Sequence, residues 1–109
     1  VAASSALTEP KVDGDGENGG VTLLLFYQYV DPPWDASDFK KALQDVEDLG
    51  LKHGLTGRMR VATEGLNCTL TGTREGVRRW CRDLRNYGER GEFRDTEFKL
   101  TDDLPKGQL

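Results

Sequence analysis

Residues 57–75 of this 109-residue chain are GRMRVATEGLNCTLTGTRE, and they contain the pattern that decides the fold. Apolar and basic residues alternate over residues 58–62, and after a turn at Glu64-Gly65 apolar and polar residues alternate over residues 66–71. Alternation with a period of two is typical of a strand that buries one face. This stretch therefore predicts a β-hairpin whose apolar row is Met59, Val61, Leu66, Cys68 and Leu70.

The sequence on either side of the hairpin predicts two helices. Before it, a helix is expected over residues 36–49, with Asp35 or Ser37 as the N-cap. After it, Thr73 is a suitable N-cap and Gly88 a suitable end for a second helix. The residues at helical spacing are Phe39, Ala42, Leu43, Val46 and Leu49 in the first helix and Val77, Trp80, Cys81, Leu84 and Tyr87 in the second.

Two further strands complete the predicted domain. The β-rich run of residues 21–30 is stopped by Asp31-Pro32-Pro33, because consecutive prolines cannot continue a ladder of hydrogen bonds. A short last strand is expected over residues 96–101. The order βαββαβ predicts an α+β, ferredoxin-like fold over residues 21–103, with a four-stranded antiparallel sheet and both helices on one face.

The ends and the overall charge set limits on function. Residues 1–20 have no aromatic residue and few large apolar ones, so we expect a flexible N-terminal tail. That tail has one Lys against four acidic residues, and most of the net charge of −4 comes from it. The negative charge argues mildly against tight, nonspecific nucleic-acid binding, and no apolar run approaches the length of a membrane-spanning helix.

The residues that most often carry chemistry lack a suitable setting. Cys68 and Cys81 form no C-x-x-C pair, and both fall in apolar rows, so we expect them in the core rather than in a metal site, a disulfide or a nucleophilic centre. His53 is the only histidine, and we interpret it as incidental. The sequence thus predicts no catalytic residue, no metal and no cofactor in this chain.

RNA recognition by the sheet is one function that this fold supports. Such a sheet needs stacking aromatic residues on both central strands. Here Tyr27 and Tyr29 lie on the first strand only, and the third strand, residues 66–70, has none. We therefore interpret the two tyrosines as half-buried residues that fill space.

Acyl-phosphate hydrolysis is a second such function. It needs an arginine in a phosphate-binding loop after the first strand and an asparagine on the second strand. The loop of residues 31–35 is acidic and has few backbone N–H groups, and Val61 stands where the asparagine is expected. An autonomous acylphosphatase is therefore the least supported alternative.

Arginines on the second helix suggest a binding surface. Residues 74–94 contain seven arginines against four acidic residues, a surplus that favours contact with RNA phosphates. The alternative is a solvated helix face with intrahelical pairs such as Arg79–Asp83. The arginines at three- and four-residue spacing are Arg74, Arg78, Arg82 and Arg85.

Three stretches together resemble a known family. The hairpin sequence of residues 57–75, the strand motif Tyr27-Gln28-Tyr29-Val30 and the later pair Phe98-Lys99 are similar to motifs of rhodanese-domain proteins of the tRNA uridine hydroxylase type, plant rhodanese-like proteins included. The similarity covers the acylphosphatase-like, or ferredoxin-like, N-terminal domain of that family. Bacterial members have a small residue in place of Cys68, which argues further against a catalytic role for this cysteine.

The resemblance implies an accessory role for this chain. The catalytic cysteine of the family lies in a rhodanese domain that follows, so residues 104–109 are expected to begin a linker to that absent domain. The parent protein would hydroxylate the wobble uridine of tRNA, with this domain assisting, or else transfer sulfur, with this domain as a docking module. The expected partners are therefore the rhodanese domain and tRNA, with no membrane and no metal.

The resemblance also bears on the hairpin and on location. Glu64, Gly65 and Asn67 match the family motif and are expected to face the catalytic domain or the RNA. The alternative is that Glu64-Gly65 only form the turn and that Asn67 caps it. A plastid location is implied by plant members, with the cytoplasm as the other expectation.

Overall fold

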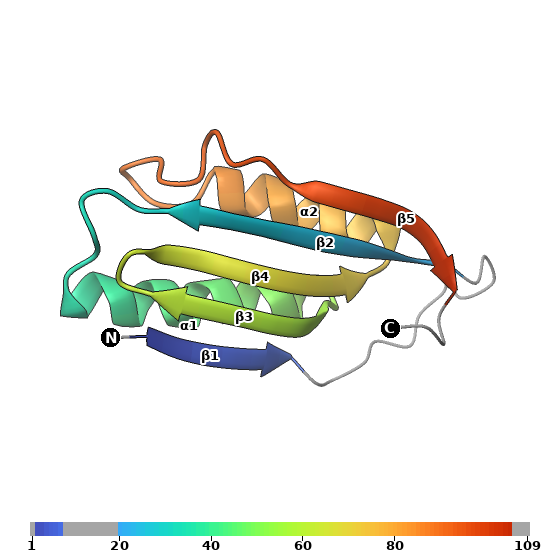
Figure 1. Cartoon of the computed structure of the whole chain (residues 1–109), viewed down its shortest axis with the longest axis horizontal. Coiled ribbons are helices and arrows are strands. Elements are labelled where there is room, and N and C mark those ends of the chain that lie inside the picture. Colours follow the sequence, from blue (N-terminus) through green and yellow to red (C-terminus); the bar gives the residue numbers. More distant parts are fainter. Residues whose placement is uncertain (1, 8–19, 106–109) are drawn as a thin grey trace.

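The alternating hairpin lies near the middle of one antiparallel sheet in the computed structural model, which describes residues 2–7 and 20–105 (Figure 1). Strand β3 (Thr56–Ala62) and strand β4 (Gly65–Gly72) form the hairpin. Strand β2 (Gly20–Tyr29) pairs with β4, and β5 (Lys99–Pro105) pairs with the other edge of β2. These four strands and the two helices confirm the predicted ferredoxin-like fold.

A fifth strand, β1 (Ala2–Leu7), pairs with β3 and gives the sheet order β1-β3-β4-β2-β5. The prediction of a flexible tail over residues 1–20 is therefore wrong for residues 2–7, while residues 8–19 lie outside the described part of the chain. Without β1, the outer backbone groups of β3 would be a free sheet edge, and any short extended segment can pair with such an edge. Side-chain propensity, which is weak in AASSAL, does not reveal that pairing.

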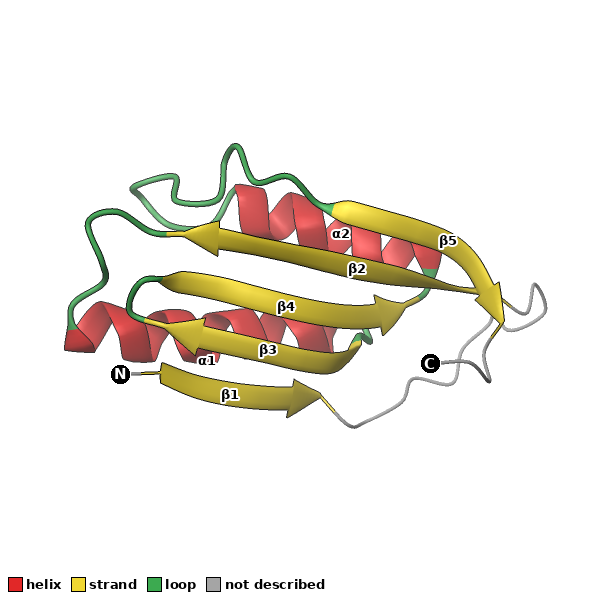
Figure 2. Ribbon diagram, in the orientation of Figure 1, coloured by secondary structure: helices red, strands yellow, loops and turns green. Residues whose placement is uncertain are grey.

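Helices α1 (Ala36–Lys52) and α2 (Arg74–Arg85) cover the same face of the sheet (Figure 2). Of the two N-caps predicted for α1, Asp35 is the one that forms, and Thr73 is confirmed for α2. Each side chain accepts a hydrogen bond from the backbone N–H three residues later. Helix α1 runs three residues further than predicted and ends before Gly54, whose positive φ of 73° ends the helix.

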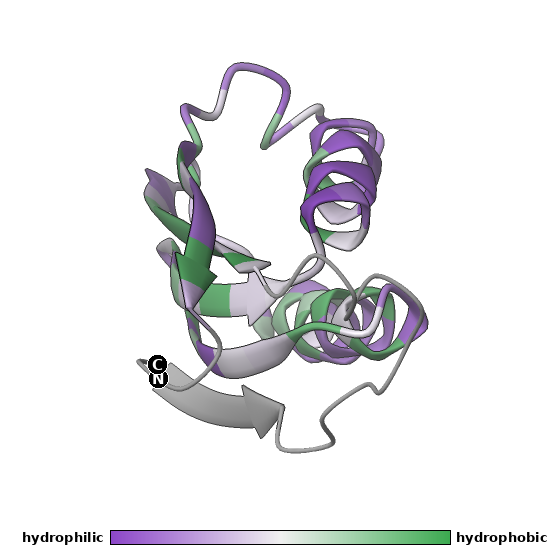
Figure 3. Cartoon of the chain, turned by 90° about the vertical axis from the view of Figure 1, so that its right-hand side faces the viewer, coloured by the Kyte–Doolittle hydropathy of each residue, from purple (hydrophilic) through white to green (hydrophobic). Residues whose placement is uncertain are grey.

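The predicted apolar rows meet between the helices and the sheet, the two layers that the side view of Figure 3 shows, and form one buried cluster there. The hairpin row is buried as expected, and so are the inward residues of α2. Leu43, Leu49 and Tyr87 are only partly buried at the margin of this core. The central residues of the core are Leu24, Phe26, Val46, Met59, Val61, Leu70, Val77, Trp80 and Leu84.

The last strand differs from the prediction in its limits. It begins at Lys99 rather than at Thr96 and continues through Pro105. Leu104 and Pro105 thus belong to the sheet and not to a linker, because Leu104 pairs with Val21 and Pro105 with Gly20. The remainder of the predicted linker, residues 106–109, lies outside the described residues.

Gly65 is required for β2 to approach the hairpin. Its φ is 145°, and a Cβ atom built there would lie 2.0 Å from the carbonyl oxygen of Gln28 and 2.9 Å from the Cα of Tyr29. Both atoms belong to the backbone of β2, so no side-chain rotation relieves the clash. Gly91 also has a positive φ, of 67°, but a Cβ atom there would meet only the flexible guanidinium of Arg94.

We predict that Gly65→Ala lowers the free energy of unfolding by about 3 kcal/mol or more, because two paired backbones must separate. The matched variant Gly91→Ala loses only about 1 kcal/mol, the cost of a left-handed conformation with a Cβ atom. Urea unfolding followed by circular dichroism measures both variants. Equal losses in the two proteins would contradict the proposed role of the backbone contact.

Candidate functional site

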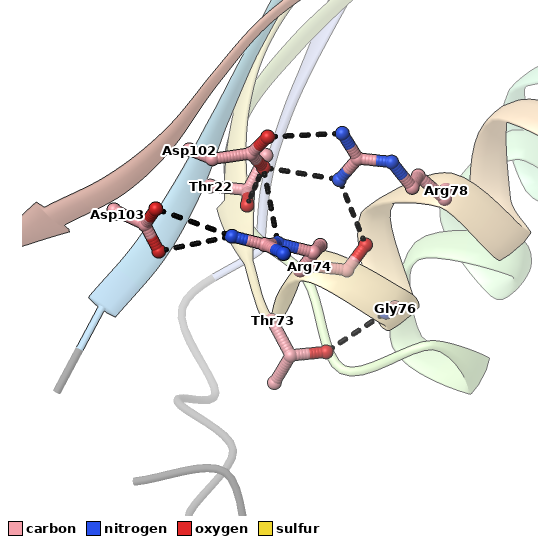
Figure 4. A network of polar contacts seen from close by, with 7 residues as sticks. All are labelled: Thr22, Thr73, Arg74, Gly76, Arg78, Asp102 and Asp103. Atoms are coloured by element: carbon pink, nitrogen blue, oxygen red, sulfur yellow. Dashed lines mark hydrogen bonds and ion pairs between the residues drawn. The ribbon is translucent and has the colours of Figure 1, made fainter. Parts of the chain in front are cut away.

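The four predicted arginines of α2, here called the α2 arginine surface (Arg74, Arg78, Arg82 and Arg85), are directed mostly toward other parts of the chain. Arg78 donates two hydrogen bonds to the carboxylate of Asp102, both of 3.0 Å. Arg74 contacts Asp103 at 3.1 Å (Figure 4). Both aspartates are on β5, so these arginines connect α2 to the last strand.

The Arg78 guanidinium lowers the pKa of Asp102 well below its usual range. The hydrogen bond from Thr22 lowers the pKa of that carboxyl further, so that Asp102 receives donors from α2 and from β2. The same hydrogen bond with Asp102 raises the pKa of Arg78. This network joins β2, β5 and α2 at one end of the sheet.

Arg85 also has a structural role. Its guanidinium donates to the backbone carbonyl of Thr96 at 2.9 Å and lies 4.9 Å from the centre of the Phe98 ring, a cation–π arrangement. Arg82 is different, because 66% of its side chain is exposed and its neighbour is Asp83, 3.6 Å away. Of the α2 arginine surface, Arg82 is therefore the residue most available to a ligand.

The predicted intrahelical pair Arg79–Asp83 does not form. Arg79 instead lies 3.6 Å from Glu75. Asp83 accepts a hydrogen bond of 2.7 Å from the largely buried ring of His53, and this bond lowers the pKa of Asp83. His53 thus joins the end of α1 to α2, a contact between residues 30 positions apart that helical spacing does not reveal.

Of the three hairpin residues predicted as a site, Glu64 and Gly65 have structural contacts, and Asn67 has an exposed side chain without a hydrogen bond among the described residues. The carbonyl of Glu64 accepts the N–H of Val30 at 2.7 Å, and Gly65 permits the close approach of β2. These contacts agree with the interpretation that Glu64-Gly65 form the turn. The side chain of Asn67, by contrast, is exposed and makes no hydrogen bond within the described residues, so it does not cap the turn.

Both tyrosines of β2 are exposed on the outer face of the sheet, which the helices do not cover. Tyr27 is 69% and Tyr29 is 73% exposed, so the prediction that they are half-buried space-fillers is wrong. The neighbours Leu24 and Phe26 are buried toward the helices, and the strand alternation then places the tyrosines outward. Because residues 23–27 are all apolar or aromatic, their sequence does not indicate which row is covered.

Asn67 and Arg60 lie beside Tyr27 on this outer face. The strand register places Tyr27 opposite Asn67, and Asn67 opposite Arg60. A hollow of about 490 Å³ is lined by these three residues together with Tyr29 and Glu64. Asn67 and Glu64 thus share one surface, whereas the α2 arginine surface belongs to the opposite layer, as the side view of Figure 3 shows for the elements.

The cysteines and the loop after β2 bear on catalysis. Burial raises the pKa of the Cys81 thiol to about 11 and that of Cys68 further still, the opposite of what a nucleophilic thiolate requires. In the loop of residues 31–35, Pro32 and Pro33 have no N–H, and the N–H of Trp34 is bonded to the carbonyl of Thr63 at 2.9 Å. That loop therefore has little capacity to bind a phosphate.

The described residues contain no group of three or more histidine, cysteine, aspartate or glutamate side chains arranged to hold a metal ion. None of the helices in the described part of the chain is long and apolar enough to cross a membrane.

We predict that Asp102→Asn shifts urea unfolding to lower urea concentrations at pH 7. The pKa of Asp102 is lowered in the folded protein, so its stabilising effect is complete above the ordinary aspartate pKa of about 3.9 and is lost as the pH falls through the folded-state value. The difference between wild type and variant should therefore be constant from pH 5 to pH 8 and shrink below about pH 4.

The matched control is Asp103→Asn, which removes a carboxylate that is 77% exposed and contacts only Arg74. Its midpoint should move less than that of Asp102→Asn, because exposed ion pairs contribute little. A midpoint difference for Asp102→Asn that persists unchanged in strong acid would contradict the assigned charge interaction.

Known proteins share sequence similarity with most of this domain. The sequence profile of the UPF0176 acylphosphatase-like domain matches residues 21–106. A tRNA uridine(34) hydroxylase of Lactococcus lactis subsp. lactis is 40% identical over 79 residues, which are 72% of this chain and 22% of that protein. A tRNA uridine(34) hydroxylase of Corynebacterium diphtheriae is 32% identical over 88 residues, covering 77% of this chain and 26% of that protein.

A plant protein is similar over a comparable length. The rhodanese-like domain-containing protein 7 of Arabidopsis thaliana is 32% identical over 74 residues, which are 68% of this chain and 15% of that protein. The chain thus spans about a fifth of the length of the curated relatives it matches. Because the family profile matches nearly all of the described residues and the fold is the one expected of the family, this chain belongs to the UPF0176 acylphosphatase-like domain family.

Proposed function

We propose that this domain is the non-catalytic, N-terminal accessory part of a rhodanese-like protein and assists the hydroxylation of the wobble uridine of tRNA by a following catalytic domain. The observation that carries the proposal is the match to proteins named tRNA uridine(34) hydroxylase, in which the similar region is 22% of the length. The remaining length offers room for a separate catalytic domain.

The chemistry of the domain itself supports an accessory role. A sulfur-transferring or hydroxylating centre built on cysteine requires an accessible thiolate. Cys68 and Cys81 are buried with raised pKa values. The loop of residues 31–35, for its part, has few N–H groups available for the phosphate of an acyl phosphate, because two of its residues are prolines and the N–H of Trp34 is bonded to Thr63.

The contribution of the domain, in this proposal, is to hold RNA and to pack against the catalytic domain. Arg82 and Arg79, exposed on α2, are suited to contact phosphates by charge. The other three arginines of the α2 arginine surface, Arg74, Arg78 and Arg85, are hydrogen-bonded to residues outside the helix, so their role toward RNA is secondary. Glu64, Gly65 and Asn67 lie on the opposite layer and are proposed to face RNA or the catalytic domain there.

We predict that the chain binds an unmodified tRNA transcript with an affinity that falls as salt rises, because phosphate contacts release counterions. Arg82→Ser should weaken this binding about two- to fivefold and reduce the slope of log affinity against log salt by about 0.9, the loss of one phosphate contact. Fluorescence anisotropy with labelled tRNA between about 50 and 200 mM salt measures both effects.

Arg78 and Arg85 are unsuitable for that test, since the replacement of Arg78 also removes the contact of α2 with β5, and that of Arg85 removes the contact with Thr96 in the segment before β5. Lys41→Ser is a matched control: it removes an exposed cation from α1 whose partner is Asp45, and it should leave tRNA affinity unchanged. The absence of tRNA binding at low salt would contradict the proposed function.

A further inference from the structure

We propose that the outer sheet face, defined here by Tyr27, Tyr29, Arg58, Arg60 and Asn67, binds single-stranded RNA, with bases stacked on the tyrosines and phosphates at the two arginines. The inference rests on the proposed function, because it names the surface and the class of RNA through which the domain would act. It places the main RNA contact on the layer opposite to the arginines of α2.

Tyr27 and Tyr29 present two exposed rings on this face. They are two residues apart on β2, their ring centres are 5.9 Å apart, and more than two thirds of each side chain is exposed. Neither hydroxyl makes a hydrogen bond within the described residues. Among the large apolar and aromatic residues of the described surface these two are the most exposed, ahead of Leu51 on α1. Base stacking on aromatic rings contributes affinity for each stacked base in proteins that bind single strands.

Two arginines on β3, Arg58 and Arg60, share the outer sheet face with the tyrosines. Asn67 lies between Tyr27 on one neighbouring strand and Arg60 on the other. Arg58 is two residues from Arg60 on β3 and lies opposite Thr69. In the described part of the chain neither arginine has an ion-pair partner, in contrast to Arg74 and Arg78 on α2. A positive charge with no protein partner, beside an exposed ring, is complementary to the phosphate that follows a stacked base.

The outer sheet face has a hollow with polar groups around it. The hollow at the hairpin end has a volume of about 490 Å³ and is lined by both tyrosines, Arg60 and Asn67. The free amide of Asn67 has both donors and an acceptor, which suits the edge of an unpaired base. Negative charges stand at the ends of the surface, at Glu64 beside the hairpin and at Glu97 before β5, so the strand of RNA would cross the sheet nearer β3.

These features favour RNA over a docked protein domain as the occupant. The fully buried centre of a protein interface is depleted of charged residues, although tyrosine and arginine are common in interfaces. Here Arg60, which has no ion-pair partner among the described residues, and the free amide of Asn67 line the same hollow as the two rings, and Arg58 lies further along β3. That combination of stacking and charge is typical of surfaces that bind single-stranded nucleic acid.

The test uses the full 109-residue chain and two fluorescein-labelled RNAs: an anticodon-type hairpin with a seven-nucleotide loop and a fully paired duplex of similar length. The double variant Tyr27→Ala/Tyr29→Ala should bind the hairpin about tenfold more weakly or worse, because stacked bases are lost. Its affinity for the duplex should change little. Tyr27→Phe/Tyr29→Phe keeps the rings and should retain hairpin affinity, which separates stacking from loss of the hydroxyls.

The variant Arg58→Ser/Arg60→Ser should reduce the salt slope of hairpin binding by about 1.4, the value for two contacts to a single strand. The matched variant Arg79→Ser/Arg82→Ser removes two arginines from α2 and should have the smaller effect on the hairpin. Circular dichroism verifies folding, and every substituted side chain is exposed.

Two negative results have different meanings. If wild type binds the hairpin and Tyr27→Ala/Tyr29→Ala binds it equally well, the sheet-face inference is overturned, and a protein partner becomes the better occupant; the proposed function is unaffected. If wild type binds neither tRNA nor the hairpin at low salt, both the inference and the proposed function fail.

Discussion

The contact between Gly65 and the backbone of β2 determines much of this structure. Because Gly65 lacks a Cβ atom, the carbonyl of Gln28 can lie against it, and the N–H of Val30 bonds to the carbonyl of Glu64. These contacts set the register of β2 against β4. A slip of one residue would exchange the two rows of β2, with Phe26 outward and the tyrosines in the core. The core and the proposed RNA surface therefore depend on the same backbone contact.

Arginine has two roles in this domain, and the position of acidic residues separates them. On α2, Arg78 faces Asp102, and the ion pair holds the helix to β5. On β3, Arg58 and Arg60 point away from the helices and have no acidic partner among the described residues. Several arginines of residues 74–94 therefore contribute to packing, and the arginines on β3, together with the exposed Arg79 and Arg82 on α2, remain available to a ligand.

Much of the fold could be predicted from the sequence, because its elements follow local rules. The caps at Asp35 and Thr73, the helical spacing on α2 and the alternation in the hairpin all depend on residues close together in the chain. The candidate site could be predicted only in part. Asn67 was identified through a family motif, but the exposure of Tyr27 and Tyr29 was missed, because the uninterrupted apolar run of β2 does not mark a buried row.

By itself, the sequence determined the order of strands and helices from β2 to β5 and the residues that share each row, since both follow from short-range periodicity and from turn and cap residues. Only the tertiary structure decided which row of β2 the helices cover and which arginines find acidic partners. The deciding contacts join distant residues: Thr22 and Asp102 are 80 positions apart, and Arg78 and Asp102 are 24 apart. Periodicity carries no information over such separations, because pairing there depends on how the layers pack.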